Sequence, residues 1–312
     1  SIPGDFNERH DPDHLKPKYF NPKSVLQKSG HGSYVETPLG EVYLVHLTAR
    51  PFVPELRCTL GRETAIQKMK WTKDGWLRME DGSNFAKEYV DESNIQEYKV
   101  EQCPDFDDFD KGELGLQYYS PRIMPSSFAD VKSRPGYVRI RGQESRCSLN
   151  KVSILARKLT SVYAVVTTKM EFIPYVHQHS AGLIMYYDNM NYIYLRKYYS
   201  DTLKHSAISV IHLENGEKTE FINTRTRVED SPIYFRLVIE GRKSHFEWSY
   251  DGTNYSVIGK IFDTTKFSDE YCKYGEFTGT FVGITCADRV LHKHYADFDF
   301  FEYIADESKN VE

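Results

Sequence analysis

The chain has 312 residues, of which 40% are hydrophobic, 14% aromatic and 27% charged, and its net charge is −5. This composition indicates a folded globular protein long enough for two domains. The acidic balance and the lack of a basic block argue against a nucleic-acid partner, and no apolar run approaches the roughly 20 residues that span a bilayer.

The first 80 residues predict a small amount of sheet. Residues 1–30 are rich in Pro, Asp, Lys and His and are predicted to be a loop, with no apolar signal-peptide region after Ser1. Four strands are expected in residues 31–80, at "SYVET", "EVYLVHL", "TAIQKMKWT" and "GWLRME". Four strands are one blade of a propeller and too little to form a stable domain alone. The N-terminal part is therefore expected to be incomplete.

The rest of the chain predicts an antiparallel sandwich. The acidic segment "CPDFDDFDKGEL" (103–114) reads as a solvated linker or the face of an edge strand. From about residue 160, short β-rich runs alternate with turns, and the pairs Asn215-Gly216 and Asp251-Gly252 are typical of two-residue hairpins. One short helical turn is expected in "SDEYCKYG" (268–275).

The cysteines predict no covalent or metal cross-link. They are scattered, odd in number and contain no CxxC pair: Cys58, Cys103, Cys147, Cys272 and Cys286. Free thiols in a reducing compartment are expected, which favours the cytoplasm, and the spacing is wrong for structural zinc.

Several motifs resemble a known family when they are taken in order. They are "GHGSYVET", "YLVHLTARP", "LGRETAIQKMKW", "DGWLRM", "RPGYVRIRGQES", "HQHSAGLIMYYD", "SYDGTNY", "FTGTFVGITC" and "YADFDFFEY". Together they resemble the C-terminal part of the glycoside hydrolase family 43 β-xylosidases, from about Gly30 to Ile304. The resemblance implies an all-β protein: the last blade of a five-bladed β-propeller at 1–102, followed by a concanavalin-A-like antiparallel β-sandwich at 103–312.

The resemblance also implies an activity. Members of this family are inverting exo-glycosidases that release terminal xylose from xylo-oligosaccharides, and arabinofuranose release is a compatible side activity. They use an Asp base, a Glu acid and a second Asp, all from earlier blades, so none of the three is assigned here. The chain alone is expected to be inactive. The missing blades are expected from the full-length protein, a partner chain or another copy, and a homo-oligomer is favoured. No cofactor is required.

Two residues are candidates for supporting the active site. By itself, His31 before Gly32 would be a turn or packing residue, and Arg62 would be a surface or salt-bridging residue. The resemblance implies instead that His31 projects into the propeller pit near the carboxylates, where an imidazole can orient them. It implies that Arg62 lies beside the base, keeps it ionised and donates to sugar hydroxyls.

Neighbouring residues receive other roles. Glu63 is predicted to support the backbone or pair with Arg62, and His46 to be a core histidine. Phe277 is either a core strand residue or, as the resemblance implies, an aromatic wall of the sugar pocket contributed by the sandwich. Phe281 is the better core candidate.

Asp297 and Asp299 alternate with aromatic residues, which places both carboxylates on one face of a strand. Oxygen ligands of this kind suit a structural calcium ion, and a solvent-facing acidic edge is the simpler interpretation. Two further functions remain open for the chain, a carbohydrate-binding module that uses some of its 23 tyrosines, and a scaffold for oligomerisation.

Overall fold

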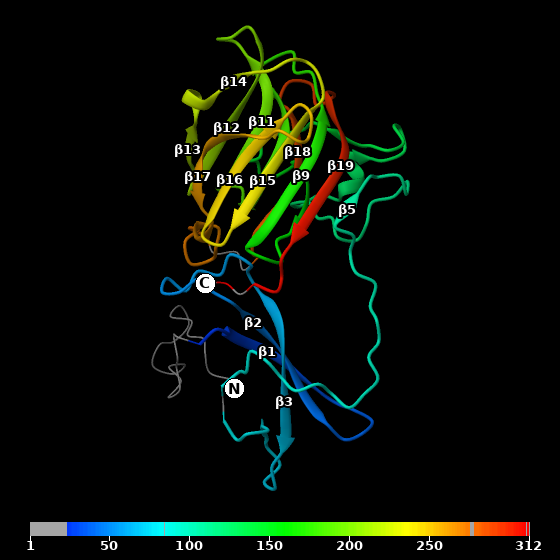
Figure 1. Ribbon diagram of the computed structural model, residues 1–312, viewed down its shortest axis with the longest axis vertical. Helices are drawn as coiled ribbons and strands as arrows, with labels where there is room; N and C mark the ends of the chain where they lie inside the picture. The colour runs from blue at the N-terminus through cyan, green and yellow to red at the C-terminus, as the bar shows by residue number, and fades with distance from the viewer. Residues whose placement is uncertain (1–23, 84, 275–277, 310, 312) are drawn as a thin grey trace.

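The computed structural model describes residues 24–83, 85–274, 278–309 and 311, and these form an all-β protein in two parts (Figure 1). A four-stranded sheet lies below a sandwich of two larger sheets, and the chain passes from the first part to the second once. Phe277 lies outside the described residues. The predicted fold class is confirmed for both parts.

The first sheet is antiparallel and follows chain order, with β1 at one edge and β4 at the other. Its strands are β1 (Gln27–Glu36), β2 (Val42–Ala49), β3 (Glu63–Trp71) and β4 (Leu77–Met79). Its own buried cluster consists of Val42, Met69 and Met79 with two half-buried leucines. So small a core agrees with the expectation that this sheet does not form a domain by itself.

The sandwich consists of a seven-stranded and an eight-stranded sheet whose paired strands run antiparallel. The seven-stranded sheet contains β8 (Ser153–Lys158), β10 (His179–Asp188), β11 (Asn191–Ser200), β12 (His205–Glu214), β13 (Glu217–Glu220), β14 (Thr226–Arg227) and β18 (Phe281–Asp288). The eight-stranded sheet contains β5 (Phe106–Asp107), β6 (Ala129–Asp130), β7 (Val138–Arg141), β9 (Tyr163–Glu171), β15 (Ile233–Glu240), β16 (Lys243–Ser249), β17 (Ser256–Asp263) and β19 (Tyr295–Ala305). The described residues also contain three single-turn 3-10 segments: η1 (Pro125–Ser127), η2 (Ile222–Thr224) and η3 (Thr264–Lys266).

The main core lies between the two large sheets because strand side chains alternate in direction. In β15, Ile233, Phe235, Leu237 and Ile239 are buried at every second position, as period-two patterning requires. The predicted two-residue hairpin at Asn215-Gly216 is confirmed, whereas Asp251-Gly252 lies in a longer loop between Ser249, the last residue of β16, and Ser256, the first of β17. Asn215 and Gly216 both adopt positive φ between β12 and β13, where only such residues turn without strain.

The acidic segment 103–114 is part of the sandwich rather than a solvated linker. Its short strand β5 pairs with Phe301 and Glu302 of β19, and Phe109 is buried in the main core. The edge-strand interpretation is therefore correct. In 268–275, the carbonyl of Ser268 accepts from the amides of Tyr271 and Cys272. This is one hydrogen-bonded turn, and no helix is assigned in the described part of the segment.

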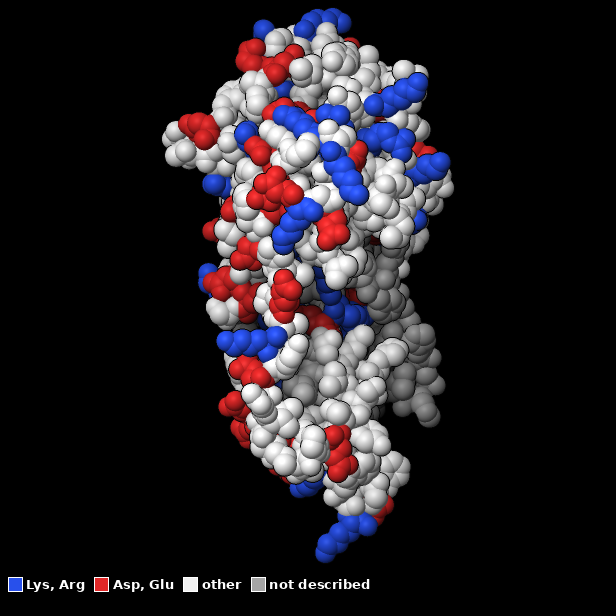
Figure 2. Space-filling view, turned by 90° about the vertical axis from the view of Figure 1, so that its right-hand side faces the viewer, with Lys and Arg blue, Asp and Glu red and all other residues white. Residues whose placement is uncertain are grey.

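The described surface carries mixed charge. Acidic and basic side chains are interspersed over the face in Figure 2, without a large area of one sign. This face agrees with the small net charge and shows no basic footprint for nucleic acid. Among the described residues, no helix is long and apolar enough to cross a membrane. None of the five cysteines forms a disulfide bond.

Candidate functional site

The candidate residues of the first sheet lie at its end that faces the sandwich. Gly30 of β1 is opposite Leu47 of β2, and Leu47 is opposite Thr64 of β3. His31 and Arg62 therefore flank the same end of β2, separated by two inter-strand spacings, or roughly 10 Å. Residues that are distant in sequence are thus brought to one region of the molecule.

His31 lies in a bulge of the edge strand β1. Gly30 is paired with Leu47 and Ser33 with Val45, so the ladder takes up one extra residue between them. His31 has a φ of 45° and its side chain is exposed. The bulge directs an imidazole away from the regular ladder. Whether it faces a propeller pit stays a prediction.

Arg62 is held at both ends by the sandwich. Its Nη1 donates to Asp269 Oδ2 at 2.8 Å, and its carbonyl accepts from Lys158 Nζ at 2.7 Å. The Arg62 side chain is 15% exposed and that of Asp269 only 7%. Burial lowers the pKa of Lys158, which still has a carbonyl partner. Arg62 therefore lies at the junction of the two parts with its guanidinium fixed.

The carboxylates on the sandwich side of this junction each have a cationic partner. Asp269 also accepts from the Tyr187 hydroxyl, and Lys28 Nζ of β1 lies 3.7 Å from its Oδ2. Lys28 is ion-paired with Glu270, which in turn accepts from the amide of Cys58 at 2.8 Å. The turn that contains Asp269 and Glu270 thus binds both β1 and the loop before β3.

Two neighbouring predictions have different outcomes. Glu63 pairs with Arg50, through Nη2 at 2.8 Å and Nε at 3.1 and 3.2 Å, so the partner predicted from sequence, Arg62, was wrong. Arg62 turns toward Asp269 instead, since the buried carboxylate of the sandwich is within its reach. His46 is 3% exposed and its Nδ1 lies 2.9 Å from the carbonyl of Leu47, as expected of a core histidine.

Asp297 and Asp299 lie on the outer face of the eight-stranded sheet and are ion-paired. Asp297 is 5% exposed and receives Nε and Nη2 of Arg139 at 2.8 Å and Nη1 of Arg134 at 2.9 Å. Asp299 receives Lys169 Nζ at 2.6 Å. Three cations already occupy the oxygens that would ligate calcium, so these residues do not fit that ion. Among the described residues, no group of three or more His, Cys, Asp and Glu side chains is arranged to hold a metal.

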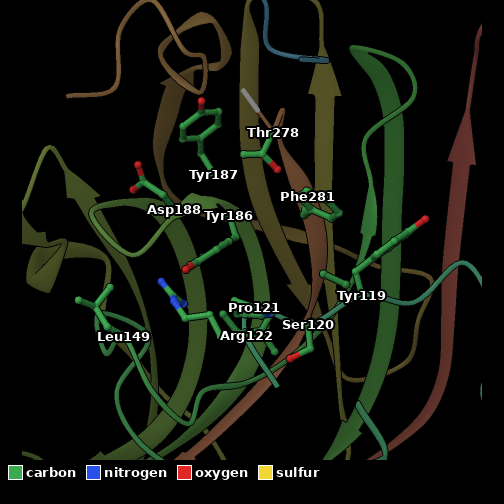
Figure 3. Close-up of a pocket in the computed structure, with 12 residues that line it drawn as sticks. Tyr119, Ser120, Pro121, Arg122, Leu149, Tyr186, Tyr187, Asp188, Thr278 and Phe281 are labelled. Atoms are coloured by element: carbon green, nitrogen blue, oxygen red, sulfur yellow. The ribbon is translucent and has the colours of Figure 1, made fainter. Parts of the chain in front are cut away.

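A pocket of about 410 Å³ opens on the outer face of the seven-stranded sheet, beside the junction (Figure 3). Its floor contains the aromatic rings of Tyr186 and Phe281, and the ring of Tyr119 meets Phe281 edge to face at 5.7 Å. The other lining residues are Ser120, Pro121, Arg122, Leu149, Ile154, Ala156, Tyr187, Asp188 and Thr278. In Figure 3 the Tyr187 ring projects away from the group of Tyr186, Pro121 and Arg122. Half-buried Phe281 packs against the buried cluster on this face of the sheet and also lines the pocket, and it is not part of the main core between the two sheets.

Sequence patterns gave no sign of Asp269, Tyr187 or Lys158. Asp269 and Lys158 are common surface residue types, and their contacts with Arg62 span 207 and 96 residues of sequence. No local periodicity predicts such a contact.

Comparisons with known proteins agree with this arrangement. Residues 106–304 match the family model described as "Beta xylosidase C-terminal Concanavalin A-like domain", and residues 1–77 match "Glycosyl hydrolases family 43". The second match begins before Gly30, so the similarity is longer than the motifs alone indicated.

Individual relatives extend the same result. The chain is 31% identical over 309 residues to a β-xylosidase of Bacillus subtilis (strain 168), covering 95% of this chain and 57% of that protein. It is 32% identical over 295 residues to the xylosidase/arabinosidase 43B of Humicola insolens, covering 91% and 54%. The crystal structure of xylan β-1,4-xylosidase from Bacillus halodurans C-125 superposes with a TM-score of 0.87 at 39% identity, covering 91% and 54%. The chain thus spans about half the length of the relatives it matches.

Proposed function

The chain belongs to glycoside hydrolase family 43, and we propose that it is the C-terminal part of an inverting exo-glycosidase that releases terminal xylose from xylo-oligosaccharides. The observation that carries this proposal is the extent of the match: one propeller-type sheet and the whole sandwich align with xylosidases over more than nine-tenths of the chain. The name of the Humicola insolens relative also supports arabinofuranose as a second sugar.

In this mechanism two carboxyl groups act from opposite sides of the sugar. One is protonated and donates to the leaving oxygen, and the other is ionised and activates a water molecule. Arg62 would keep the base ionised by its fixed charge and donate to sugar hydroxyls, because a guanidinium offers several N–H groups in a rigid plane. His31 would orient a carboxylate by hydrogen bonding. Phe277 would form an aromatic wall that excludes water from the sugar.

The acid and the base are proposed to come from blades other than the one in this chain. The described carboxylates near the junction are already paired: Glu63 with Arg50, Asp269 with Arg62, and Glu270 with Lys28. Each of these carboxylates is bound to a cation of the chain, which does not suit a group that must reach the glycosidic oxygen and donate a proton to it.

Hydrolysis of 4-nitrophenyl β-D-xyloside tests this proposal directly. We expect release of nitrophenol by the complete protein with all five blades, and none by the 312-residue chain alone. Inversion would be followed by NMR of the released xylose, which appears first as the α-anomer. Activity of the chain alone would refute the assignment of the acid and base to other blades, and an inactive complete protein would refute the hydrolase function.

The surface of the first sheet also supports the proposal that this chain associates with further blades. Tyr34, Val35, Ile66, Trp71 and Trp76 are between 47% and 60% exposed, and one edge of β1 pairs with no other strand of the described residues. Exposed apolar side chains and open strand edges favour association. Further blades, in the same polypeptide, a partner chain or a second copy, would cover them, and assembly as a homo-oligomer is part of the proposal. Light scattering of the chain alone should show an oligomer or aggregate, and a stable monomer would count against it.

The pocket on the sandwich favours a second candidate function, binding of a saccharide ring. Tyr186 and Phe281 offer apolar surface for the C–H face of a sugar, and Ser120 Oγ and Asp188 Oδ2 have no hydrogen-bond partner among the described residues. Addition of xylotriose to the ¹⁵N-labelled chain should shift amide signals of the pocket segment 119–122. Unchanged signals at millimolar xylotriose would exclude this function. The compartment proposed for the protein is the cytoplasm, supported by five cysteines that form no disulfide bond.

A further inference from the structure

We propose that Asp269, a residue of the sandwich, is a positioning residue that fixes the Arg62 guanidinium for catalysis; this inference rests on the proposed function. Both oxygens of Asp269 are engaged: Oδ2 accepts from Arg62 Nη1 at 2.8 Å, and Oδ1 accepts from the Tyr187 hydroxyl. With donors from two different elements, the carboxylate has one orientation. Because its side chain is only 7% exposed, the charge-assisted bond to Arg62 is little weakened by water.

The turn that carries Asp269 is itself anchored. The carbonyl of Ser268 accepts from the amides of Tyr271 at 3.2 Å and Cys272 at 2.9 Å. Phe267 and Cys272 are 3% exposed, and the carbonyl of Phe267 accepts from Thr280 Oγ1 at 3.0 Å. Asp269 is therefore attached to the rigid core of the sandwich, and its position does not depend on a flexible loop.

Two contacts with the sandwich restrict Arg62, one at its guanidinium and one at its main-chain carbonyl. Asp269 holds the guanidinium and Lys158 holds the main-chain carbonyl, and both partners belong to the sandwich. A free arginine side chain has many rotamers, and ordering it costs conformational entropy. The sandwich orders the Arg62 side chain before substrate binds. The entropy lost in ordering this side chain therefore does not weaken substrate binding or slow the reaction.

Glu270, which follows Asp269, connects the sandwich to β1 in a similar way. Glu270 is ion-paired with Lys28, three residues before His31, and accepts from the amide of Cys58 at 2.8 Å. One acidic pair in the sandwich therefore binds the strand that carries His31 and the loop that carries Arg62. The sandwich orients the candidate active-site residues rather than only bracing the propeller.

The test compares Asp269→Asn with a matched control, Asp297→Asn, in the complete five-bladed protein. Asp297 is likewise buried and bound by arginine, and its partners Arg134 and Arg139 belong to the sandwich. Asp269→Asn should lower kcat/KM roughly 10- to 100-fold, whereas Asp297→Asn should lower the melting temperature and leave kcat/KM within about twofold. Equal effects of both variants on kcat/KM would overturn the proposal.

The pH dependence of kcat/KM distinguishes a role of Asp269 in positioning Arg62 from an effect of the Asp269 charge alone. Removing a negative charge near the base would, by charge alone, lower its pKa and move the acid limb of kcat/KM to lower pH. Displacement of Arg62 would raise the pKa of the base and move that limb to higher pH. We expect the upward shift; a downward shift would mean that Asp269 does not position Arg62.

Two further measurements keep the test decisive. If Asp269→Asn does not fold, Tyr187→Phe removes one donor to Asp269 and should lower kcat/KM by a smaller factor in the same direction. In the complete protein, NMR should detect a slowly exchanging Arg62 guanidinium signal that Asp269→Asn abolishes. This NMR signal does not depend on activity. An inactive protein that still shows the signal would refute the proposed function but not the ordering of Arg62 by Asp269. An unchanged signal in the variant would refute the ion pair as the source of order.

Discussion

Gly61 and Gly279 pack backbone against backbone at the junction of the two parts. A Cβ added to Gly61 would lie 2.5 Å from the Cα and N of Gly279, and one added to Gly279 would lie 2.6 Å from the carbonyl oxygen of Leu60. Both glycines have positive φ, +70° and +81°. Beside them, the amide of Thr280 donates to the carbonyl of Thr59 at 3.0 Å. The loop before β3 and the loop before β18 therefore meet at a distance that only glycine permits.

Gly61→Ala should loosen this contact. The substitution adds a methyl group against backbone that cannot move aside, in a conformation that costs an alanine about 1 kcal/mol, so we expect a loss of about 2–4 kcal/mol in the free energy of unfolding. Gly40→Ala is the matched control, because Gly40 has a φ of +82° and nothing within 4 Å of an added Cβ. Urea denaturation should show a loss of only about 1 kcal/mol there. Equal losses in both variants would show that backbone strain, not the contact, accounts for the effect.

His212 should make the sandwich less stable in mild acid. Burial lowers the pKa of this side chain from 6.5 to about 4, although Glu214 opposes the change. Between these values the unfolded chain binds the proton and the folded chain does not, so stability falls as pH drops from about 6.5 to about 4. The contribution of this group is roughly 3 kcal/mol.

The measurement is urea denaturation of the wild type and His212→Gln at pH 7, 5 and 4. The wild type should lose stability faster than the variant over this range, because glutamine does not titrate. Parallel curves for the two proteins would mean that another group carries the acid sensitivity.

Removal of metal ions should leave the sandwich unchanged. The oxygens of Asp297 are occupied by Arg134 and Arg139, so we expect no calcium to be bound there. The melting temperature of the chain should be the same within error with 5 mM EDTA, roughly the excess that strips exposed calcium sites. A fall of several degrees that added calcium reverses would contradict this prediction.

Glu63 should be dispensable for chemistry. It forms a forked ion pair with Arg50, and both side chains are about four-fifths buried. In the complete protein, Glu63→Gln should lower stability by about 1–2 kcal/mol and leave kcat/KM within about threefold. Loss of a general acid would instead cost roughly 10²- to 10⁴-fold. A loss of that size with an unchanged melting temperature would make Glu63 the acid.

The candidate site was only partly predictable from the sequence. His31 and Arg62 were found through a resemblance between motifs, and the structure places both at the end of the first sheet that faces the sandwich. Of the two roles predicted for Glu63, pairing with Arg62 was wrong, because Arg62 is bound to Asp269 and Glu63 is bound to Arg50. The pocket at Tyr186 and Phe281 was not predicted, because it is closed by Tyr119–Arg122, a segment without periodicity.

The sequence by itself determined the all-β class, the hairpin at Asn215-Gly216 and the family, because alternation of side chains and turn chemistry depend on residues close together in the chain. Only the tertiary structure decided which charged groups meet. Asp269 pairs with Arg62 rather than with water, and Asp297 with two arginines rather than with calcium. These choices depend on burial: a carboxylate removed from water is stable only with a partner, and the packing of distant strands selects which cation is near enough to provide it.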